Sequence, residues 1–292
     1  MDNYTALIID LKKSRSYNHE TRYLIQTYMM KILDVLNTAY SKSILRDVDF
    51  SAGDEIQGLF MSPEAAYLYY RMLSIWLYPI KIRAGIGIGT WDLKISGKGT
   101  TSQDGKVYHN ARHAINYTDE LEGYSVLCYS GRKNDLTINT MIGSIASISG
   151  KLSMNQNQLS LIVEMLYPVF LSCKPIYLED WESMVDLFKY KNDFDHKVNK
   201  SKKSLPFDNI RDDRIDIPFD FHTSSQKYIN DTDFFITSGK QRGIPSVLAN
   251  ILTLSRQTIA TSLYSGNIYM IRNMVITALK EMDAFSTEEI KP

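Results

Sequence analysis

Two stretches decide the fold of the N-terminal part of the chain: ALIIDLKKS at residues 6–14 and FSAGDEIQGLF at residues 50–60. The first predicts an apolar strand that ends in Asp10, and the second predicts a turn at Gly53 and Asp54 between two apolar strands. A strand that ends in Asp10 and a turn that contains Asp54 can bring these two carboxylates together at one edge of a sheet. Two close carboxylates cannot both stay charged unless a cation neutralises them, and Mg²⁺ binds a few carboxylates together with nucleotide phosphates. The sequence therefore predicts a protein that handles nucleoside triphosphates.

The composition narrows the class of protein. A length of 292 residues favours two domains over one, and a hydrophobic fraction of 44% can supply their cores. The formal net charge of zero gives no overall indication of nucleic-acid or membrane binding. Cys128 and Cys173 lack metal-ligand spacing and predict no disulfide framework. There is no signal-peptide pattern and no apolar run that could span a bilayer, so we expect a cytoplasmic protein without a membrane partner.

Around the two stretches, hydrophobic periodicity predicts the order β-α-β-β-α-β, followed by α-β. This order is typical of the ferredoxin-like, split βαβ arrangement, so the expected fold class is α+β. Ser62 is expected to cap a helix, because Pro63 and an acidic residue follow it. The expected elements are strand 4–10, helix 18–40, a hairpin of strands 44–51 and 56–61, helix 62–76, strand 80–89, helix 107–120 and strand 124–129.

Strand 80–89 has the clearest alternation in the chain. Gly85, Gly87 and Gly89 leave one of its faces bare, which allows another group to approach the backbone closely. A loop rich in Gly, Ser, Thr and Lys follows at residues 96–106.

The remainder of the chain has a helical pattern. We expect an α+β domain over residues 1–132, a helical domain over residues 133–200 and a second helical domain over residues 236–292. Residues 201–235 are expected to form a linker, because the chain from residue 191 to residue 215 is charged and poor in large apolar residues.

Residues 247–263 resemble a helix-turn-helix. Ser255 would cap the second helix, and Ile259 and Leu263 would face the core. Arg256, Gln257 and Thr258 would begin the recognition helix, where side chains reach the edges of DNA bases. The segment from Phe234 to Lys280 contains no Asp or Glu but has five cations, a local balance that favours DNA. These cations are Lys240, Arg242, Arg256, Arg272 and Lys280.

Four segments of the α+β part resemble nucleotide cyclases, in the order in which those families have them. Residues 10–14 resemble the Asp-Ile-x-x-Ser/Thr segment of class III nucleotide cyclases, and residues 52–56 resemble the Gly-Gly-Asp-Glu-Phe turn of diguanylate cyclases. Residues 83–89 are similar to the Arg-x-Gly-Ile strand of the cyclases, and residues 107–112 are similar to their Val-Asn-x-Ala-x-Arg helix start. The whole chain most resembles the SatD family, in which such a palm-like domain is followed by helix-turn-helix material.

The resemblance implies a palm domain with two-metal chemistry on a nucleoside triphosphate. Asp10 and Asp54, with the carbonyl of Leu11, would hold Mg²⁺ or Mn²⁺. Glu55 would ligate metal or take up a proton, and Arg112 would offset charge on the transferring phosphorus.

The resemblance also implies residues that bind the nucleotide. The backbone from Leu11 to Ser14, with Lys12 or Arg15, would cradle phosphates. Arg83 and Asn110 are further candidates of this kind. The families it resembles act as dimers, so a homodimer is expected, with the Gly85-Gly87-Gly89 face and the 96–106 loop as candidate contact regions.

Three functions stay open on the sequence alone. The first is a metal-dependent nucleotidyl cyclase or cyclic oligonucleotide synthase that makes a nucleotide signal. The second is a helix-turn-helix DNA-binding regulator whose palm-like domain only binds nucleotide or dimerises. The third is an antiphage defence or stress sensor that joins both activities. Neither the base nor the product follows from the residues, because the side chains that select the purine in adenylyl cyclases have no secure counterpart here.

Overall fold

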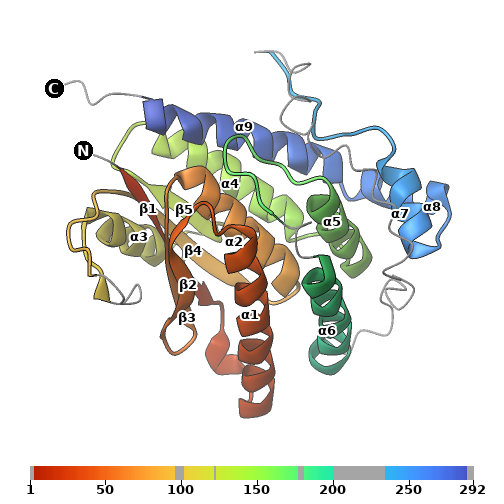
Figure 1. Ribbon diagram of the computed structural model, residues 1–292, viewed down its shortest axis with the longest axis horizontal. Helices are drawn as coiled ribbons and strands as arrows, with labels where there is room; N and C mark the ends of the chain where they lie inside the picture. The colour runs from red at the N-terminus through yellow and green to blue at the C-terminus, as the bar shows by residue number, and fades with distance from the viewer. Residues whose placement is uncertain (1–2, 96–101, 122, 177–180, 200–233, 288–292) are drawn as a thin grey trace.

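A five-stranded sheet forms the centre of the N-terminal half, and the fold is α+β. The computed structural model describes residues 3–95, 102–121, 123–176, 181–199 and 234–287 (Figure 1). The strand order in the sheet is β2-β3-β1-β4-β5, and every neighbouring pair is antiparallel except the parallel pair β4 and β5. The strands are β1 (Tyr4–Leu11), β2 (Ile44–Ala52), β3 (Glu55–Phe60), β4 (Ile82–Gly89) and β5 (Val126–Tyr129).

Helices cover both faces of this sheet. Leu7 and Ile9 of β1 point into the larger hydrophobic cluster, which includes residues of α1 (His19–Ala39) and α2 (Pro63–Leu77). Ala6 and Ile8 point the other way, into a smaller cluster that includes α3 (Lys106–Tyr117). The alternation of β1 therefore decides which residues of the sheet lie on the α3 face.

The helix starts follow local capping chemistry. The Asn18 side chain accepts a hydrogen bond from the Thr21 amide at α1, and Ser62 accepts one from the Ala65 amide at α2. The predicted capping role of Ser62 is thus confirmed.

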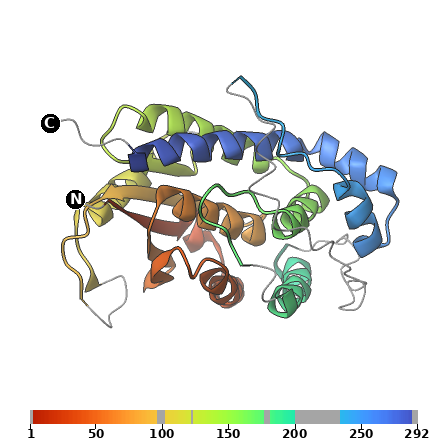
Figure 2. The ribbon, with the colours of Figure 1, turned by 45° about the horizontal axis from the view of Figure 1, so that its top comes forward.

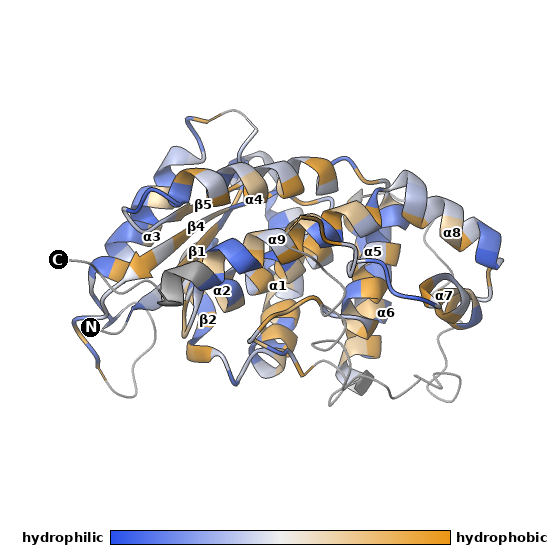
Figure 3. Cartoon of the chain, turned by 90° about the horizontal axis from the view of Figure 1, so that it is seen from above, coloured by the Kyte–Doolittle hydropathy of each residue, from blue (hydrophilic) through white to orange (hydrophobic). Residues whose placement is uncertain are grey.

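The helices after the sheet pack on the same large cluster, above α2 and beside α1 (Figure 2). Hydrophobic residues run along α5, α6 and α7 in Figure 3, and buried side chains of all three belong to this cluster. These helices are α4 (Asp135–Ser149), α5 (Met154–Leu166), α6 (Trp181–Asn199), α7 (Ile244–Leu252), α8 (Arg256–Ser265) and α9 (Ile268–Thr287). The large cluster has members on both sides of residue 132, and the division of the chain into domains stays a prediction. The expected linker 201–235 lies almost wholly outside the described residues.

A buried ion triad joins three of these helices. Arg71 of α2 donates a hydrogen bond to Glu164 of α5 at 2.8 Å, and Arg272 of α9 forms an ion pair with the same carboxylate oxygen at 2.8 Å. Arg272 also donates to the carbonyls of Gly239 and Tyr167. Its side chain is only 1% exposed. Arg272 therefore cannot belong to a positive surface, and only the other four of the five cations in this segment are exposed.

The bare face of β4 is occupied by α3. A Cβ atom added to Gly87 would lie 2.1 Å from the Ala111 amide nitrogen, and one added to Gly85 would lie 2.2 Å from the Ala111 carbonyl oxygen. The predicted close approach to this strand is confirmed, and the approaching group is a helix of the same chain. The glycine face is therefore not free for a partner subunit, so that proposed contact was wrong. Residues 96–101 of the other proposed contact region lie outside the described residues.

We expect Gly87→Ala to destabilise the fold, because the added methyl group would meet backbone atoms that cannot move aside. Overpacking of this kind costs about 1–3 kcal/mol or more. Gly89→Ala is the matched control in the same strand, because its added Cβ would come no closer than 3.1 Å to any neighbour. Chemical denaturation of both variants measures the difference, and equal losses of unfolding free energy would contradict this account of the α3 contact.

Candidate functional site

Three charged residues converge where β1 ends on the α3 face of the sheet. Asp10 pairs with Arg83 of β4, and Ile9 pairs with Ile56 of β3. One step further along the same register places Asp10 beside Glu55, the first residue of β3. Because alternate residues share a face, all three side chains project on the same side as Ala6 and Ile8. The pairing of β3, β1 and β4 thus brings these three side chains together at this edge.

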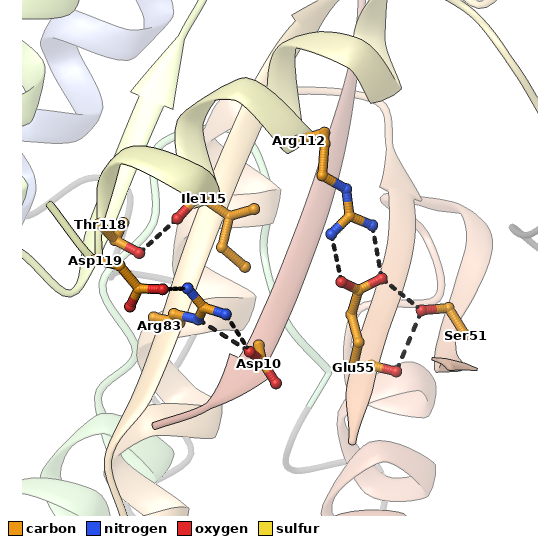
Figure 4. Close-up of polar contacts among 8 residues, drawn as sticks. All are labelled: Asp10, Ser51, Glu55, Arg83, Arg112, Ile115, Thr118 and Asp119. Carbon is orange, nitrogen blue, oxygen red and sulfur yellow. Dashed lines mark hydrogen bonds and ion pairs between the residues drawn. The ribbon is translucent and has the colours of Figure 1, made fainter. Parts of the chain in front are cut away.

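Arg83 bridges two carboxylates at the edge. Its Nε and Nη2 atoms donate to Oδ2 of Asp10 at 3.0 and 2.6 Å, and its Nη1 donates to Asp119 in the turn after α3 (Figure 4). Only one oxygen of Asp10 is used, and its Oδ1 makes no hydrogen bond with a described residue. The arginine therefore orients the Asp10 carboxylate and leaves one oxygen open.

Arg112 reaches from α3 to the second carboxylate of the edge. Its two terminal nitrogens donate to Glu55 at 2.5 and 2.7 Å, and Ser51 donates to the same carboxylate at 2.9 Å (Figure 4). Burial would raise the pKa of Glu55, but the hydrogen bonds from Arg112 and Ser51 outweigh it and lower this pKa below the ordinary value. Glu55 is therefore a carboxylate at neutral pH.

Asp54 lies in the turn between β2 and β3, directly before Glu55. Its Oδ2 atom is shielded from solvent and has no hydrogen-bond partner. The described residues contain no cluster of three or more His, Cys, Asp or Glu side chains able to hold a metal. Mg²⁺ keeps several waters and uses one or two carboxylates plus phosphate oxygens, so a metal site at Asp10 and Asp54 stays a prediction. An unpartnered buried carboxylate oxygen is the kind of atom that such an ion satisfies.

The loop after β1 has the shape of an anion-binding nest. Lys13 adopts a left-handed conformation at φ 59°, and a short 3₁₀ helix, η1 (Ser14–Ser16), follows it. A left-handed residue followed by right-handed ones points successive amides into one concavity. The Ser14 carbonyl accepts a hydrogen bond from Arg22, which holds the loop against α1.

The charged side chains of this loop differ in burial. Lys12 is half-buried and donates to the Tyr124 carbonyl at 3.4 Å, and burial lowers its pKa although Asp119 acts in the opposite direction. Arg15 is exposed.

Asn110 occupies a different environment from the other predicted site residues. It is buried on α3, and its side-chain amide donates to the Ile88 carbonyl of β4 at 2.7 Å. This bond fastens α3 to the sheet, and a role for Asn110 in nucleotide binding stays a prediction.

Sequence reasoning did not find Asp119 or Ser51. Neither residue lies in a motif, and each gains its position only through a partner that is distant in the sequence or across a hairpin. The predicted residues Asp10, Glu55, Arg83 and Arg112 do come together at one edge.

The helices near the C-terminus present a second polar surface. The Ser255 side chain accepts a hydrogen bond from the Thr258 amide at the start of α8, and Ile259 and Leu263 are buried, as predicted. Arg256, Gln257 and Thr258 are all exposed in the first turn of α8.

Comparison with known proteins gives one match. The model of the SatD family matches residues 4–172, which spans the sheet, α4 and α5. No curated protein and no solved structure matches the chain. None of the helices in the described part combines the length and apolar character needed to cross a membrane.

We expect Arg112→Gln to raise the pKa of Glu55, because the substitution removes the two charge-assisted hydrogen bonds that lower it. A folded-state pKa below the ordinary value of 4.5 means that this pair stabilises the protein above that pH and loses its effect as the pH falls through the folded pKa. Carboxyl NMR titration of Glu55 measures the shift, with the exposed Arg15→Gln variant as the control. An unchanged titration in Arg112→Gln would refute the assignment.

Proposed function

The chain belongs to the SatD family, and we propose that it is a metal-dependent nucleotidyl cyclase or cyclic oligonucleotide synthase. It would use a nucleoside triphosphate to make a nucleotide signal. One observation carries the proposal: Asp10 and Glu55 lie on the same face of the sheet at the end of β1, with Asp54 directly before Glu55 and a nest-shaped loop directly after β1. Carboxylates for metal and amides for phosphate are the two groups that this chemistry requires.

The strand arrangement supports a palm-like domain. The order β2-β3-β1-β4, with every pair antiparallel, is the order of a ferredoxin-like βαββαβ unit. Helices α1 and α2, which connect the strands of that unit, pack on one face. In this interpretation, α3 and β5 are the additions to the palm.

Asp10, Asp54 and the Leu11 carbonyl would hold Mg²⁺ or Mn²⁺. When bound, such ions activate the attacking ribose hydroxyl and stabilise the leaving pyrophosphate. Arg83 binds Oδ2 of Asp10 and would thereby orient the carboxylate so that its Oδ1 is available to the ion. Asp119 is the second acceptor of Arg83, and it would keep the guanidinium in place when Asp10 binds a metal.

The remaining residues would bind and polarise the triphosphate. Of the backbone from Leu11 to Ser14, the Lys12 amide already donates to the Lys81 carbonyl at 2.9 Å. The amides of Lys13 and Ser14 would therefore contact the phosphates, with Lys12 or Arg15 supplying positive charge. Glu55, ionised at neutral pH, would accept a proton or complete the metal site. Arg112 is held over Glu55 at 2.7 Å and would turn from it toward charge that develops on phosphorus.

We expect the wild type to release pyrophosphate from a purine nucleoside triphosphate slowly, and only with Mn²⁺ or Mg²⁺. Asp54→Asn should abolish this release and weaken Mn²⁺ binding while the fold survives, because the change is nearly isosteric and lies in a turn. Asp47→Asn is the control, since Asp47 is an exposed carboxylate of the same hairpin.

Pyrophosphate assays with each nucleotide, chromatography of the products and Mn²⁺ titration by electron paramagnetic resonance together test the proposal. Asp54→Asn turnover or Mn²⁺ affinity equal to that of the wild type would exclude the proposed metal site.

A second candidate function is DNA binding through α8, with the sheet domain only binding nucleotide or forming a homodimer. The exposed first turn of α8, with Arg256, Gln257 and Thr258, favours it. Few cations are available for phosphates once Arg272 is excluded, so the affinity would be modest and would fall steeply with salt.

We expect Arg256→Glu to abolish a gel shift with duplex DNA at low salt, because it reverses the charge at the start of α8. Lys280→Glu is the matched control, an exposed cation of the same basic segment on α9. An unchanged shift in Arg256→Glu would place any DNA contact elsewhere.

A further inference from the structure

A cluster of cations and aromatic rings lies at the other end of the same sheet face. Tyr4, the first residue of β1, packs edge-to-face on Trp91, with ring centroids 5.6 Å apart. The guanidinium carbon of Arg46 lies 5.0 Å from the Trp91 ring centroid, and the Lys94 ammonium lies 4.9 Å from it. Lys94 also donates to the Tyr4 hydroxyl at 3.2 Å. Two cations therefore converge on one indole.

Within the described part of the chain, no carboxylate forms an ion pair with Arg46 or Lys94. Arg83 and Arg112, by contrast, pair with Asp10 and Glu55 at the end of β1, which we call the carboxylate edge. The Arg46 Nε atom is shielded from solvent and has no hydrogen-bond partner. A shielded donor without an acceptor is costly, and such groups in a native protein call for a ligand or water.

Tyr108 adds a second unpartnered donor from α3. It packs in the small hydrophobic cluster with Tyr4 and Trp91, is only 9% exposed, and its hydroxyl has no hydrogen-bond partner. Burial raises the pKa of Tyr108 to about 12, although the nearby Arg46 charge opposes the rise. The hydroxyl is therefore protonated at neutral pH. It can donate a hydrogen bond only if a ligand or water brings an acceptor to it.

We propose that Arg46, Lys94 and Tyr108 form a second ligand site, which binds a phosphate group beside Trp91. A phosphate supplies several acceptor oxygens and two negative charges, which suits a guanidinium, an ammonium and a hydroxyl. Lys94 is exposed at the rim of the cluster, and movement of its flexible side chain opens the way to the inner donors. The phosphate can be inorganic or can belong to a nucleotide.

The site is separate from the carboxylate edge. Tyr4 and Asp10 are at the two ends of β1, which corresponds to roughly 20 Å at about 3.3 Å per residue. One phosphate cannot occupy both positions, and the second site contains no carboxylate that would need a metal. The proposal therefore does not rest on the proposed function.

Trp91 itself reports on occupancy. The chain contains three tryptophans, so the difference between wild type and Trp91→Phe isolates its emission. The full-length protein is titrated with inorganic phosphate in metal-free buffer, and separately with a nucleoside monophosphate, each against sodium chloride of equal ionic strength. We expect a saturable change in wild-type fluorescence that Trp91→Phe lacks. Tighter binding of the nucleoside monophosphate would identify a nucleotide as the source of the phosphate, and equal binding would identify the phosphate group alone.

Two variants and two controls make the test specific. Arg46→Gln should weaken phosphate binding about tenfold or more, the usual effect of losing hydrogen bonds to a charged group. Tyr108→Phe should also weaken it, without lowering the melting temperature of the free protein, because the lost hydroxyl has no partner there. Lys31→Gln is the matched control, another cation 5.0 Å from an aromatic ring, that of Tyr190. Asp54→Asn should bind phosphate at this site as the wild type does.

The outcomes separate a ligand site from a packing contact. Loss of affinity in Arg46→Gln and Tyr108→Phe, with Lys31→Gln unchanged, would establish the site. A response no larger than that to sodium chloride would overturn the proposal, and so would equal affinities in Tyr108→Phe and wild type. If Arg46→Gln fails to fold, the conservative Tyr108→Phe variant still decides.

Discussion

The arrangement of the sheet face depends on how closely the backbone of α3 lies against β4. The absence of side chains at Gly85 and Gly87 lets Ala111 pack at a distance that any Cβ would prevent. Asn110 then fastens the helix to the Ile88 carbonyl. This close packing lets Arg112 reach Glu55 and places Tyr108 in the small cluster with Tyr4 and Trp91. A methyl group at Gly87 would push α3 away from β4, and we expect both contacts to weaken as a result.

The second constraint is the triad of Arg71, Glu164 and Arg272, which joins α2, α5 and α9. Two guanidinium groups share one carboxylate inside the core, and the carbonyls of Gly239 and Tyr167 accept hydrogen bonds from Nε and Nη2 of Arg272. Buried pairs contribute less to stability than their distances imply, because both partners lose their hydration. Their stronger effect is directional, since any shift of α9 would leave a charge unpaired. The C-terminal helices are thereby held in one position relative to the sheet.

Local signals predicted the elements well, and non-local contacts explain what sequence reasoning missed. The alternation of strand 80–89 and the caps Ser62 and Ser255 are properties of a few neighbouring residues, and all three predictions are confirmed. The bare face of β4 was expected to meet a close neighbour, but nothing in the sequence shows that α3 is that neighbour. Arg272 looked like a free cation because its partner Glu164 belongs to another helix. Asp119 was missed for the same reason, since only the fold brings it to Arg83.

The balanced formal charge of the chain, 33 cations and 33 anions, conceals a polarity along one sheet face. At the end of β1 the charges of Arg83 and Arg112 are compensated by the carboxylates of Asp10, Glu55 and Asp119. Under the proposed function, a triphosphate at that end would be held by Lys12 or Arg15 together with a divalent cation on the carboxylates. At the start of β1, Arg46 and Lys94 have no such carboxylates, so a phosphate group is attracted there without a metal. Under the two proposals, the same face would therefore offer two environments for phosphate, and the need for a metal would distinguish them.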